Sequence, residues 1–255
     1  MLSIHTSPLL DRAISHGEAC FETMAAINGT IFDLPRHLQR LQNGCAQLGI
    51  TLHDRESAQL YGAIMECVTD TSSTIRITIT PGQAPIGITA AGKRREVYIQ
   101  QQQRRPPAEA ELISMQHPQG EQQITAKFSS NYSIMLRLGG RTIIQQGATP
   151  LLWHHNRLCS AACANIALHL NGKWLTPAVE EGGVLPGVVR HHLLQRGILH
   201  SQTCSRSTLA DCDAIALLNS GILVQEVVSV DGAPCRNPQA ITALRAELED
   251  IIQHL

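Results

Sequence analysis

Apolar residues in the first hundred positions follow two different periods. Residues 21–28 (FETMAAIN) are followed by Gly29 and then by TIFDL. The pair Asn28-Gly29 predicts a β-hairpin here, because Asn-Gly is the strongest short-range turn signal. From 34 to 50, apolar residues return every three or four positions, which predicts a helix that ends at Gly49. These positions are Leu38, Leu41, Cys45 and Leu48. A second helix is predicted over 55–68, and strands over 74–80 and 96–101.

A polar stretch separates this region from the rest of the chain. Residues 103–112 carry few apolar side chains and include Pro106-Pro107, which interrupt both helices and central strands. We therefore predict an interdomain linker at 103–112, between a small N-terminal α+β domain (1–105) and a larger C-terminal domain (112–255). The alternative is a surface loop within a single domain.

Strand and helix patterns alternate irregularly in the second half. Asn171-Gly172 predicts a β-hairpin over 164–177. Because strands and helices do not alternate as regular βαβ units, the pattern favours an α+β fold with mixed, barrel-like packing over a doubly wound sheet. The other predicted elements are helices over 131–140, 188–197 and 238–255, and strands over 148–155, 214–220 and 227–232.

Composition narrows the classes of partner. The chain has 255 residues, enough for one or two hydrophobic cores, and 20 basic against 21 acidic residues give a formal net charge of −1. Without a basic surplus, and with only 3% aromatic residues, binding to nucleic acid or to an anionic membrane is not expected. No apolar run reaches about 18 residues and the N-terminus lacks a signal-peptide pattern, so a cytoplasmic protein is expected.

The cysteines and paired histidines form no recognisable metal motif. Eight cysteines are scattered without a CxxC pair, so reduced, buried thiols are expected rather than disulfides. His154-His155 and His191-His192 are neighbours in sequence, and neighbouring side chains point in different directions on a strand or a helix. We expect these pairs at the surface or at a dimer interface, and we predict no metal site.

Four short motifs carry groups suited to a phosphorylated cofactor. Lys127 stands in ITAKFSSNY, although a lysine taken alone is more often solvent-exposed. VLPGVVR places Pro-Gly before a helix, whose first amides suit a phosphate. NSGI adds the Ser220 hydroxyl and the Gly221 amide. Arg40 offers a permanent cation that can bind a phosphate through two nitrogens.

Three segments in unbroken order, within about residues 11–232, carry a family resemblance. They are FETMAAINGTIFDLPRHLQRLQNGCAQLGI, AKFSSNY and ANIALHLNGKWLTPAVEEGGVLPGVVR. Together they resemble the class-IV, or fold-type IV, pyridoxal-phosphate enzymes, which include branched-chain aminotransferases, D-amino acid aminotransferases and 4-amino-4-deoxychorismate lyases. The resemblance implies a two-domain fold, pyridoxal 5'-phosphate as cofactor, a small-molecule amino substrate and a homodimer.

The resemblance also implies a role for each matching residue. Lys127 is the lysine that binds the cofactor covalently and moves a proton between substrate and cofactor, for which it must be partly deprotonated. Tyr132 donates a hydrogen bond to the phenolic oxygen of the cofactor, and Phe21 lines the substrate pocket. The phosphate is bound by Arg40, the backbone amides of Val188 and Val189, Ser220 and Gly221.

One position departs from the family pattern. Five residues before Asn165, where the family carries a glutamate that pairs with the pyridine nitrogen, this chain has Ser160. A serine supplies only a neutral hydrogen bond, so the ring nitrogen is expected to be unprotonated and the electron sink weaker. Three outcomes follow: elimination, which needs less carbanion stabilisation than amino transfer; recruitment of another acid such as Glu226; or loss of turnover.

We favour elimination. NSGILVQEV also resembles the lyase form of the second phosphate loop, although Glu226 stands where the family has proline. The preferred function is a lyase that releases pyruvate from 4-amino-4-deoxychorismate and gives 4-aminobenzoate for folate synthesis. The alternatives are an aminotransferase acting on a branched-chain or D-amino acid with 2-oxoglutarate, and a catalytically silent binding or scaffold protein. Arg104-Arg105 could meet a substrate carboxylate, although solvated charge is the simpler interpretation.

Overall fold

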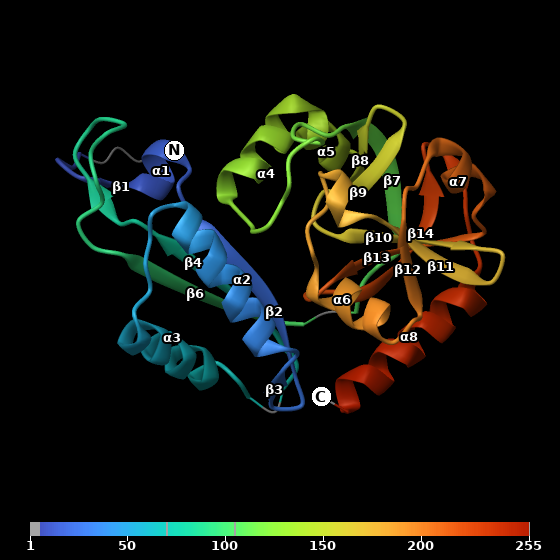
Figure 1. Ribbon diagram of the computed structural model, residues 1–255, viewed down its shortest axis with the longest axis horizontal. Helices are drawn as coiled ribbons and strands as arrows, with labels where there is room; N and C mark the ends of the chain where they lie inside the picture. Colours follow the sequence, from blue (N-terminus) through green and yellow to red (C-terminus); the bar gives the residue numbers. More distant parts are fainter. Residues whose placement is uncertain (1–5, 70, 105, 255) are drawn as a thin grey trace.

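The computed structural model describes residues 6–69, 71–104 and 106–254. Two β-sheets dominate it, one built from the first hundred residues and one from the remainder (Figure 1). The smaller sheet has the strand order β3-β2-β4-β6 and is antiparallel throughout. Its strands are β2 (Cys20–Ile27), β3 (Thr30–Ile31), β4 (Ser73–Thr80) and β6 (Glu96–Gln103).

The predicted N-terminal hairpin is confirmed. β2 and β3 pair antiparallel, with Ala26 opposite Ile31 and Ile27 opposite Thr30. Asn28 and Gly29 connect them with φ values of 49° and 76°. Both residues are left-handed, as a two-residue hairpin turn requires, and Asn and Gly are the residues that adopt this conformation at least cost.

Two predicted helices cover one face of the small sheet. They are α2 (Leu34–Gln47) and α3 (Asp54–Glu66). Ile75, Ile77 and Ile79 on β4 are fully buried in the core beneath these helices. Because strand side chains alternate, Arg76 lies on the opposite face of the sheet, toward the second half of the molecule. The short elements β1 (Leu10–Asp11), α1 (Arg12–His16) and β5 (Gln83–Ala84) were not predicted.

The larger sheet has nine strands and curls into a half-barrel (Figure 1). Its order is β12-β11-β10-β13-β14-β7-β8-β9, and β15 pairs with β14. β7 is parallel to both β14 and β8, and β11 is parallel to β12, while the other named pairs are antiparallel. This mixed sheet agrees with the predicted α+β class and barrel-like packing. The strands are β7 (Ala110–Gln116), β8 (Thr149–His154), β9 (Arg157–Ala161), β10 (Asn165–Leu170), β11 (Lys173–Pro177), β12 (Leu199–Gln202), β13 (Ala214–Asn219), β14 (Leu223–Val230) and β15 (Ala233–Pro234).

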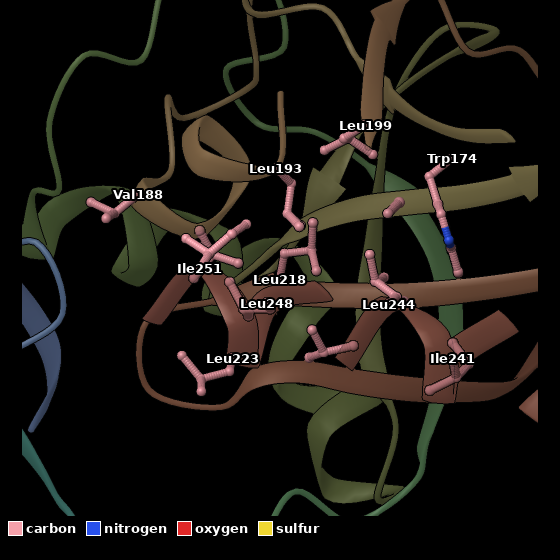
Figure 2. Close-up of a cluster of buried hydrophobic side chains, with 14 of the residues drawn as sticks. Trp174, Val188, Leu193, Leu199, Leu218, Leu223, Ile241, Leu244, Leu248 and Ile251 are labelled. Atoms are coloured by element: carbon pink, nitrogen blue, oxygen red, sulfur yellow. The ribbon is translucent and has the colours of Figure 1, made fainter. Parts of the chain in front are cut away.

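Two helices close one side of the half-barrel. These are α6 (Val188–Gln195) and α8 (Pro238–Gln253), both predicted from their apolar periodicity. Figure 2 shows how Leu193 on α6 and Leu248 on α8 pack around Leu218 of β13. Val188, at the first turn of α6, belongs to the same buried cluster. The core therefore fixes the position of the α6 N-terminus.

The helix predicted over 131–140 is interrupted near its end. α4 (Ser129–Met135) is followed by an irregular turn (Leu136–Gly140) and then by α5 (Arg141–Gln145). Within this turn Leu138 (φ −90°, ψ 21°) and Gly139 (φ 123°) have non-helical backbone angles. The chain therefore kinks at the Gly-Gly pair before a second, short helix begins. A 3-10 turn (Val179–Glu181) and α7 (Arg206–Asp211) complete the helices.

The connection between the two sheets is shorter than the predicted linker. β6 continues to Gln103 and β7 begins at Ala110, so the ends of 103–112 are strand. Arg104 donates from Nε to the carbonyl of Gly221 at 3.2 Å and from Nη2 to that of Ile222 at 3.3 Å. These two hydrogen bonds attach the connection to the turn after β13. Arg105 lies outside the described residues, and the predicted domain boundaries stay a prediction.

Within the described part of the chain, no helix combines the length and apolar character needed to cross a membrane.

Candidate active site

A cavity between α2 and the large sheet gathers side chains from both halves of the chain. It brings together most of the residues singled out from the sequence, although they are up to 180 positions apart. The predicted residues that line it are Arg40, Lys127, Tyr132, Ser160, Val188 and Ser220. Phe21, Val189 and Gly221 do not line it.

Backbone pairing with β2 fixes the position of Lys127. The carbonyl of Lys127 accepts a hydrogen bond from the Phe21 amide at 3.0 Å, and Cys20 and Phe128 form an antiparallel bridge. The preceding residue, Ala126, is fully buried against α2. A side chain at Gly44 of α2 could not fit there, since its Cβ would lie 2.7 Å from that of Ala126. The lysine-bearing segment is thus held between strand and helix, with its side chain in the cavity.

The amine of Lys127 is poised to lose its proton. Burial and, to a smaller extent, the nearby Arg40 cation lower its pKa to about 8, against the opposing effect of Glu22. At neutral pH about a tenth of such an amine is uncharged, roughly three hundred times more than for an ordinary lysine. The chain has two other lysines, Lys93 and Lys173, and both are exposed. Only Lys127 has the electrostatic character of a nucleophile or base.

Tyr132 and Phe21 form an aromatic wall beside this amine. Their ring centroids are 5.2 Å apart in a tilted arrangement, and Lys127 Nζ lies 5.7 Å from the Phe21 ring centre. Burial raises the pKa of Tyr132 well above its usual value, so its hydroxyl stays protonated and can donate. Phe21 is buried and does not line the cavity itself, although the sequence predicted it in the wall of the substrate pocket.

Arg40 lines the cavity, but one edge of its guanidinium group already binds a carboxylate. Its Nε and Nη2 donate to the two carboxylate oxygens of Glu22, at 2.6 and 2.8 Å, and Nη1 donates to the Pro186 carbonyl at 2.8 Å. A buried carboxylate thus occupies the edge formed by Nε and Nη2, and the predicted two-nitrogen contact with a phosphate stays a prediction. Two N–H groups remain, one on each terminal nitrogen.

Glu22 joins Arg40 to His37 within the small domain's core. Its Oε2 lies 2.7 Å from His37 Nδ1, and both side chains are almost completely buried. Burial alone would raise the pKa of Glu22, but the hydrogen bonds from Arg40 and His37 outweigh it and lower this pKa to about 2. His37 Nε2 is buried without a hydrogen-bond partner among the described residues.

The N-terminus of α6 presents backbone amides to the cavity. Val188 lines it, and the first amides of a helix have no partner within the helix. Gly187 precedes the helix, where an added Cβ would lie 2.0 Å from the side-chain oxygen of Asn165. Asn165 also donates to the Leu185 carbonyl at 2.8 Å, which fixes the approach to the helix. Val189 is buried in the core behind Val188, and its predicted amide contact stays a prediction.

The turn after β13 provides one of its two predicted donors. Ser220 is buried and lines the cavity. The Gly221 amide instead donates to the side-chain oxygen of Asn219 at 2.8 Å, and the Ile222 amide donates to the same oxygen at 2.9 Å. The Gly221 donor is therefore used to close the turn, and its predicted contact with a phosphate stays a prediction.

No carboxylate lines the cavity in the ranges that the structure covers. Ser160 on β9 is buried, and its hydroxyl lies 3.4 Å from the Gly183 carbonyl, a weak contact that leaves it free to turn. Glu226, considered above as a substitute acid, lies on β14 outside the cavity, 3.7 Å from Arg236 Nε. It cannot replace the missing glutamate, because its side chain is on another part of the sheet.

Three further residues of this region were missed. His117 lines the cavity, and burial, together with His154 and Arg157, lowers its pKa to about 4. Its Nδ1 accepts from the Gln119 amide at 2.9 Å, so the neutral ring carries its proton on Nε2. No sequence signal marked His117.

Arg76 and Cys163 could have been suspected from the sequence. Arg76 is the one charged residue in the alternating pattern of β4, and its guanidinium lies 3.6 Å above the Phe21 ring centre. Burial lowers its pKa, and it makes no ion pair or hydrogen bond with any described residue. Cys163 lines the cavity and is exposed, contrary to the expectation of buried thiols. The other cysteines are buried or partly buried, and all eight are free, as predicted.

The paired histidines are not simple surface residues. His192 Nε2 lies 2.7 Å from Asp33 Oδ2, so it links α6 to the start of α2. The rings of His154 and His155 are only 4.4 Å apart, against the expectation that they diverge. His155 has φ 53°, and this left-handed residue turns the second ring back toward the first.

Comparisons with known proteins agree with this arrangement. Residues 19–230 match the model of the family described as Amino-transferase class IV. A protein of Schizosaccharomyces pombe described as "Putative aminodeoxychorismate lyase" is 27% identical over 210 residues, covering 78% of this chain and 84% of that protein.

Solved structures show the same fold. A "Putative 4-amino-4-deoxychorismate lyase" of Legionella pneumophila has a TM-score of 0.78 and 24% identity, covering 98% of this chain and 96% of that one. A hypothetical aminotransferase of Mycobacterium tuberculosis in its PLP-bound form has a TM-score of 0.74 and 21% identity, covering 99% and 93%. At these identities the likeness establishes the fold, and it confirms the predicted fold-type IV architecture.

Proposed function

Because the chain belongs to the class IV aminotransferase family, we propose that it is a pyridoxal-phosphate-dependent lyase that splits 4-amino-4-deoxychorismate into 4-aminobenzoate and pyruvate. One observation supports this more than any other. The cavity holds an amine with a pKa of about 8, that of Lys127, and no Asp or Glu among the described residues that line it. The two relatives named as lyases point to the same substrate.

The residues of the cavity fit the proposed cofactor. An aldehyde needs an uncharged amine, which Lys127 provides, and a phosphate needs donors and positive charge. The remaining N–H groups of Arg40, the first amides of α6 and the Ser220 hydroxyl converge on one cavity. Gly187 keeps the approach to α6 free of a side chain, which lets an anion come close to the backbone.

The protein's own contribution is to position groups and to hold protons. When bound, pyridoxal phosphate supplies an electron sink for the carbon that bears the substrate amine. Lys127 Nζ, uncharged part of the time, takes the proton from that carbon. The Tyr132 hydroxyl keeps its proton and would donate a hydrogen bond to the cofactor.

The lack of a carboxylate favours elimination over amino transfer. A neutral Ser160 and a neutral His117 give the ring nitrogen no acid, so the negative charge that develops is less delocalised. Loss of pyruvate needs less of this stabilisation, because the ring gains aromatic character as the carbon–oxygen bond breaks. The proton leaves the amine-bearing carbon, and a proton is added to the departing enolpyruvyl group, so no water, oxidant or reductant is consumed.

Arg76 fits a substrate that carries a carboxylate. It is partly desolvated, it makes no ion pair within the described ranges, and Phe21 holds its guanidinium beside Lys127 and Tyr132. A carboxylate of the substrate would restore the lost solvation through two parallel hydrogen bonds. We therefore expect Arg76→Met to raise KM more than it lowers kcat.

The proposal is tested by supplying cofactor-loaded protein with each candidate substrate. We expect 4-aminobenzoate and pyruvate from 4-amino-4-deoxychorismate, in equal amounts, and little glutamate from 2-oxoglutarate with branched-chain or D-amino acids. Lys127→Ala is the inactive control, and Lys173→Arg is the matched control at an exposed lysine. Glutamate formation without 4-aminobenzoate would identify an aminotransferase, and inactivity toward all of these substrates would support a binding role.

A further inference from the structure

Three potential metal ligands converge where β8 turns into β9, outside the cavity. Glu121, His154 and His155 each offer one ligand atom, and all three atoms lie within 4.8 Å of one another. His154 Nε2 lies 3.4 Å from Glu121 Oε1. In a tetrahedral zinc site, ligand atoms about 2.1 Å from the metal are roughly 3.4 Å apart, so only small side-chain movements are needed.

The backbone brings the two rings together. Neighbours on a regular strand point to opposite faces, but His155 leaves the strand in a left-handed conformation with φ 53°. The ring centroids of His154 and His155 are therefore 4.4 Å apart. Both rings remain reachable from solvent, since His155 is exposed and His154 is partly buried.

The segment that carries Glu121 is held against the same turn. Arg157 donates to the Gly120 carbonyl at 2.8 Å and to the Gly182 carbonyl at 2.9 Å. Gly120 packs so closely on His154 that an added Cβ would lie 2.6 Å from the histidine's own Cβ. The backbone next to Glu121 is thus fixed, and only its side chain has to be ordered by a metal.

The surrounding charge permits a cation. Arg157 Nη2 is 3.5 Å from His154 Nδ1, the ring nitrogen that faces away from Glu121. Arg157 donates its hydrogen bonds to the carbonyls of Gly120 and Gly182, and its Nε lies 3.8 Å from Glu181 Oε2. The positive charge of Arg157 is therefore offset by Glu181, which leaves the carboxylate of Glu121 to balance part of the charge of a metal ion.

We propose that Glu121, His154 and His155 bind one divalent transition-metal ion of the Zn²⁺ type. Two imidazoles and one carboxylate are the ligand set that zinc uses where a fourth position stays open to water. Alkaline-earth ions prefer all-oxygen sites, so Mg²⁺ and Ca²⁺ should not compete. The bound ion would tie the segment 117–121, whose His117 and Gln119 line the cavity, to the β8–β9 turn.

Isothermal titration of untagged, full-length protein with ZnCl2, in a buffer that does not coordinate metals, tests this proposal. We expect one site of micromolar affinity, unaffected by millimolar Mg²⁺. Glu121→Gln and His155→Asn should each weaken it by about tenfold or more, because even indirect supports of a metal ligand contribute that much. Glu111→Gln and His200→Asn, at exposed positions away from the cluster, are the matched controls and should bind as the wild type does.

Cobalt substitution distinguishes this site from the free cysteines. Co²⁺ bound by histidine and carboxylate lacks the intense charge-transfer absorption that thiolate ligands produce. A thiolate band, no binding by the wild type, unchanged binding by either Glu121→Gln or His155→Asn, or equal losses in the control variants would each overturn the proposal. These measurements need no substrate or pyridoxal phosphate, so they stand apart from the proposed lyase activity.

Discussion

At the scale of single residues, desolvation sets the chemistry of the cavity. The same burial that lowers the pKa of the Lys127 ammonium raises that of the Tyr132 hydroxyl and lowers that of the His117 imidazolium, because in each case the charged form is disfavoured. At neutral pH Tyr132 and His117 are therefore uncharged, and so is about a tenth of Lys127. Arg40 lies beside Glu22 as its ion-pair partner.

The first residue-scale prediction concerns the pH dependence of cofactor uptake. Only the uncharged amine of Lys127 can react with an aldehyde, so the rate at which apo-protein takes up pyridoxal phosphate should rise with pH around a midpoint near 8. Stopped-flow absorbance measures this rate, with Lys173→Arg as the control. A midpoint near 10.5, the ordinary value for a lysine, would show that Lys127 is not desolvated.

The second residue-scale prediction concerns the missing carboxylate. Ser160→Glu places an acid among the residues that line the cavity and should raise any residual aminotransferase activity, since a protonated ring nitrogen is a stronger electron sink. Ser160→Ala, which removes the hydroxyl without adding charge, is the control and should not. The half-reaction with glutamate, followed by absorbance, measures the effect. If Ser160→Glu lowers every activity, the argument from the missing carboxylate fails.

At the scale of secondary-structure elements, polar contacts with little exposure fasten the helices that carry the site. Glu22 of β2 forms an ion pair with Arg40 and a hydrogen bond with His37, both on α2. Asp33, at the start of α2, contacts His192 of α6, which is distant in sequence. These contacts explain why α2 and α6 present Arg40 and Val188 to the same cavity.

Breaking the Glu22 network should be costly. Glu22→Gln keeps the shape of the side chain but leaves the Arg40 cation buried without its counter-charge, and we expect a loss of about 3 kcal/mol in the free energy of unfolding. Urea denaturation measures this loss. Glu66→Gln, at an exposed position of α3, is the control and should change little. A loss below about 1 kcal/mol would mean that the pair contributes no more than a surface ion pair.

The contact between Asp33 and His192 should make stability depend on acid pH. Burial alone would raise the pKa of Asp33, but hydrogen bonds from His192 and the Arg36 amide outweigh it and hold this pKa below its usual value. A carboxyl with a lowered pKa contributes stability above its unfolded pKa and loses it as pH falls through the folded one. The difference in Tm between wild type and Asp33→Asn should therefore be full near pH 6 and shrink below about pH 4.

Asp54→Asn, at the first turn of α3, is the control for this prediction, because Asp54 is exposed. Its Tm difference from wild type should be smaller at pH 6. A Tm difference for Asp33→Asn that stays constant down to pH 3 would contradict the interpretation.

Most elements could be predicted from local pattern, whereas their boundaries and partners could not. The hairpins at Asn28-Gly29 and Asn171-Gly172 and the helices α2, α3, α6 and α8 carry their own signals in turn residues and apolar spacing. The start of β7 was assigned to the linker, because it follows Pro106-Pro107 and its first residues, AEL, lie in a polar stretch. Its place between β14 and β8 is set by tertiary pairing, which no local pattern reveals.

At the scale of the whole molecule, two sheets with separate cores bring the site together. Arg40 comes from the layer above the small sheet, while Ser160 and Ser220 come from the large one. Family resemblance identified most of these residues, since it compares whole ordered motifs. It could not foresee that Glu22 occupies one edge of Arg40 or that Asn219 takes the Gly221 amide, because such hydrogen bonds depend on local geometry. The expected homodimer stays a prediction, which sedimentation can test.

The most direct test of the central claim is to reduce cofactor-loaded protein with borohydride and map the labelled peptide by mass spectrometry. The chain offers three lysines, and only Lys127 combines a cavity position with a lowered pKa. We predict that the phosphopyridoxyl group is found on Lys127 alone and that Lys127→Ala carries none. Labelling at Lys93 or Lys173, or an unlabelled wild-type protein, would contradict the proposed site.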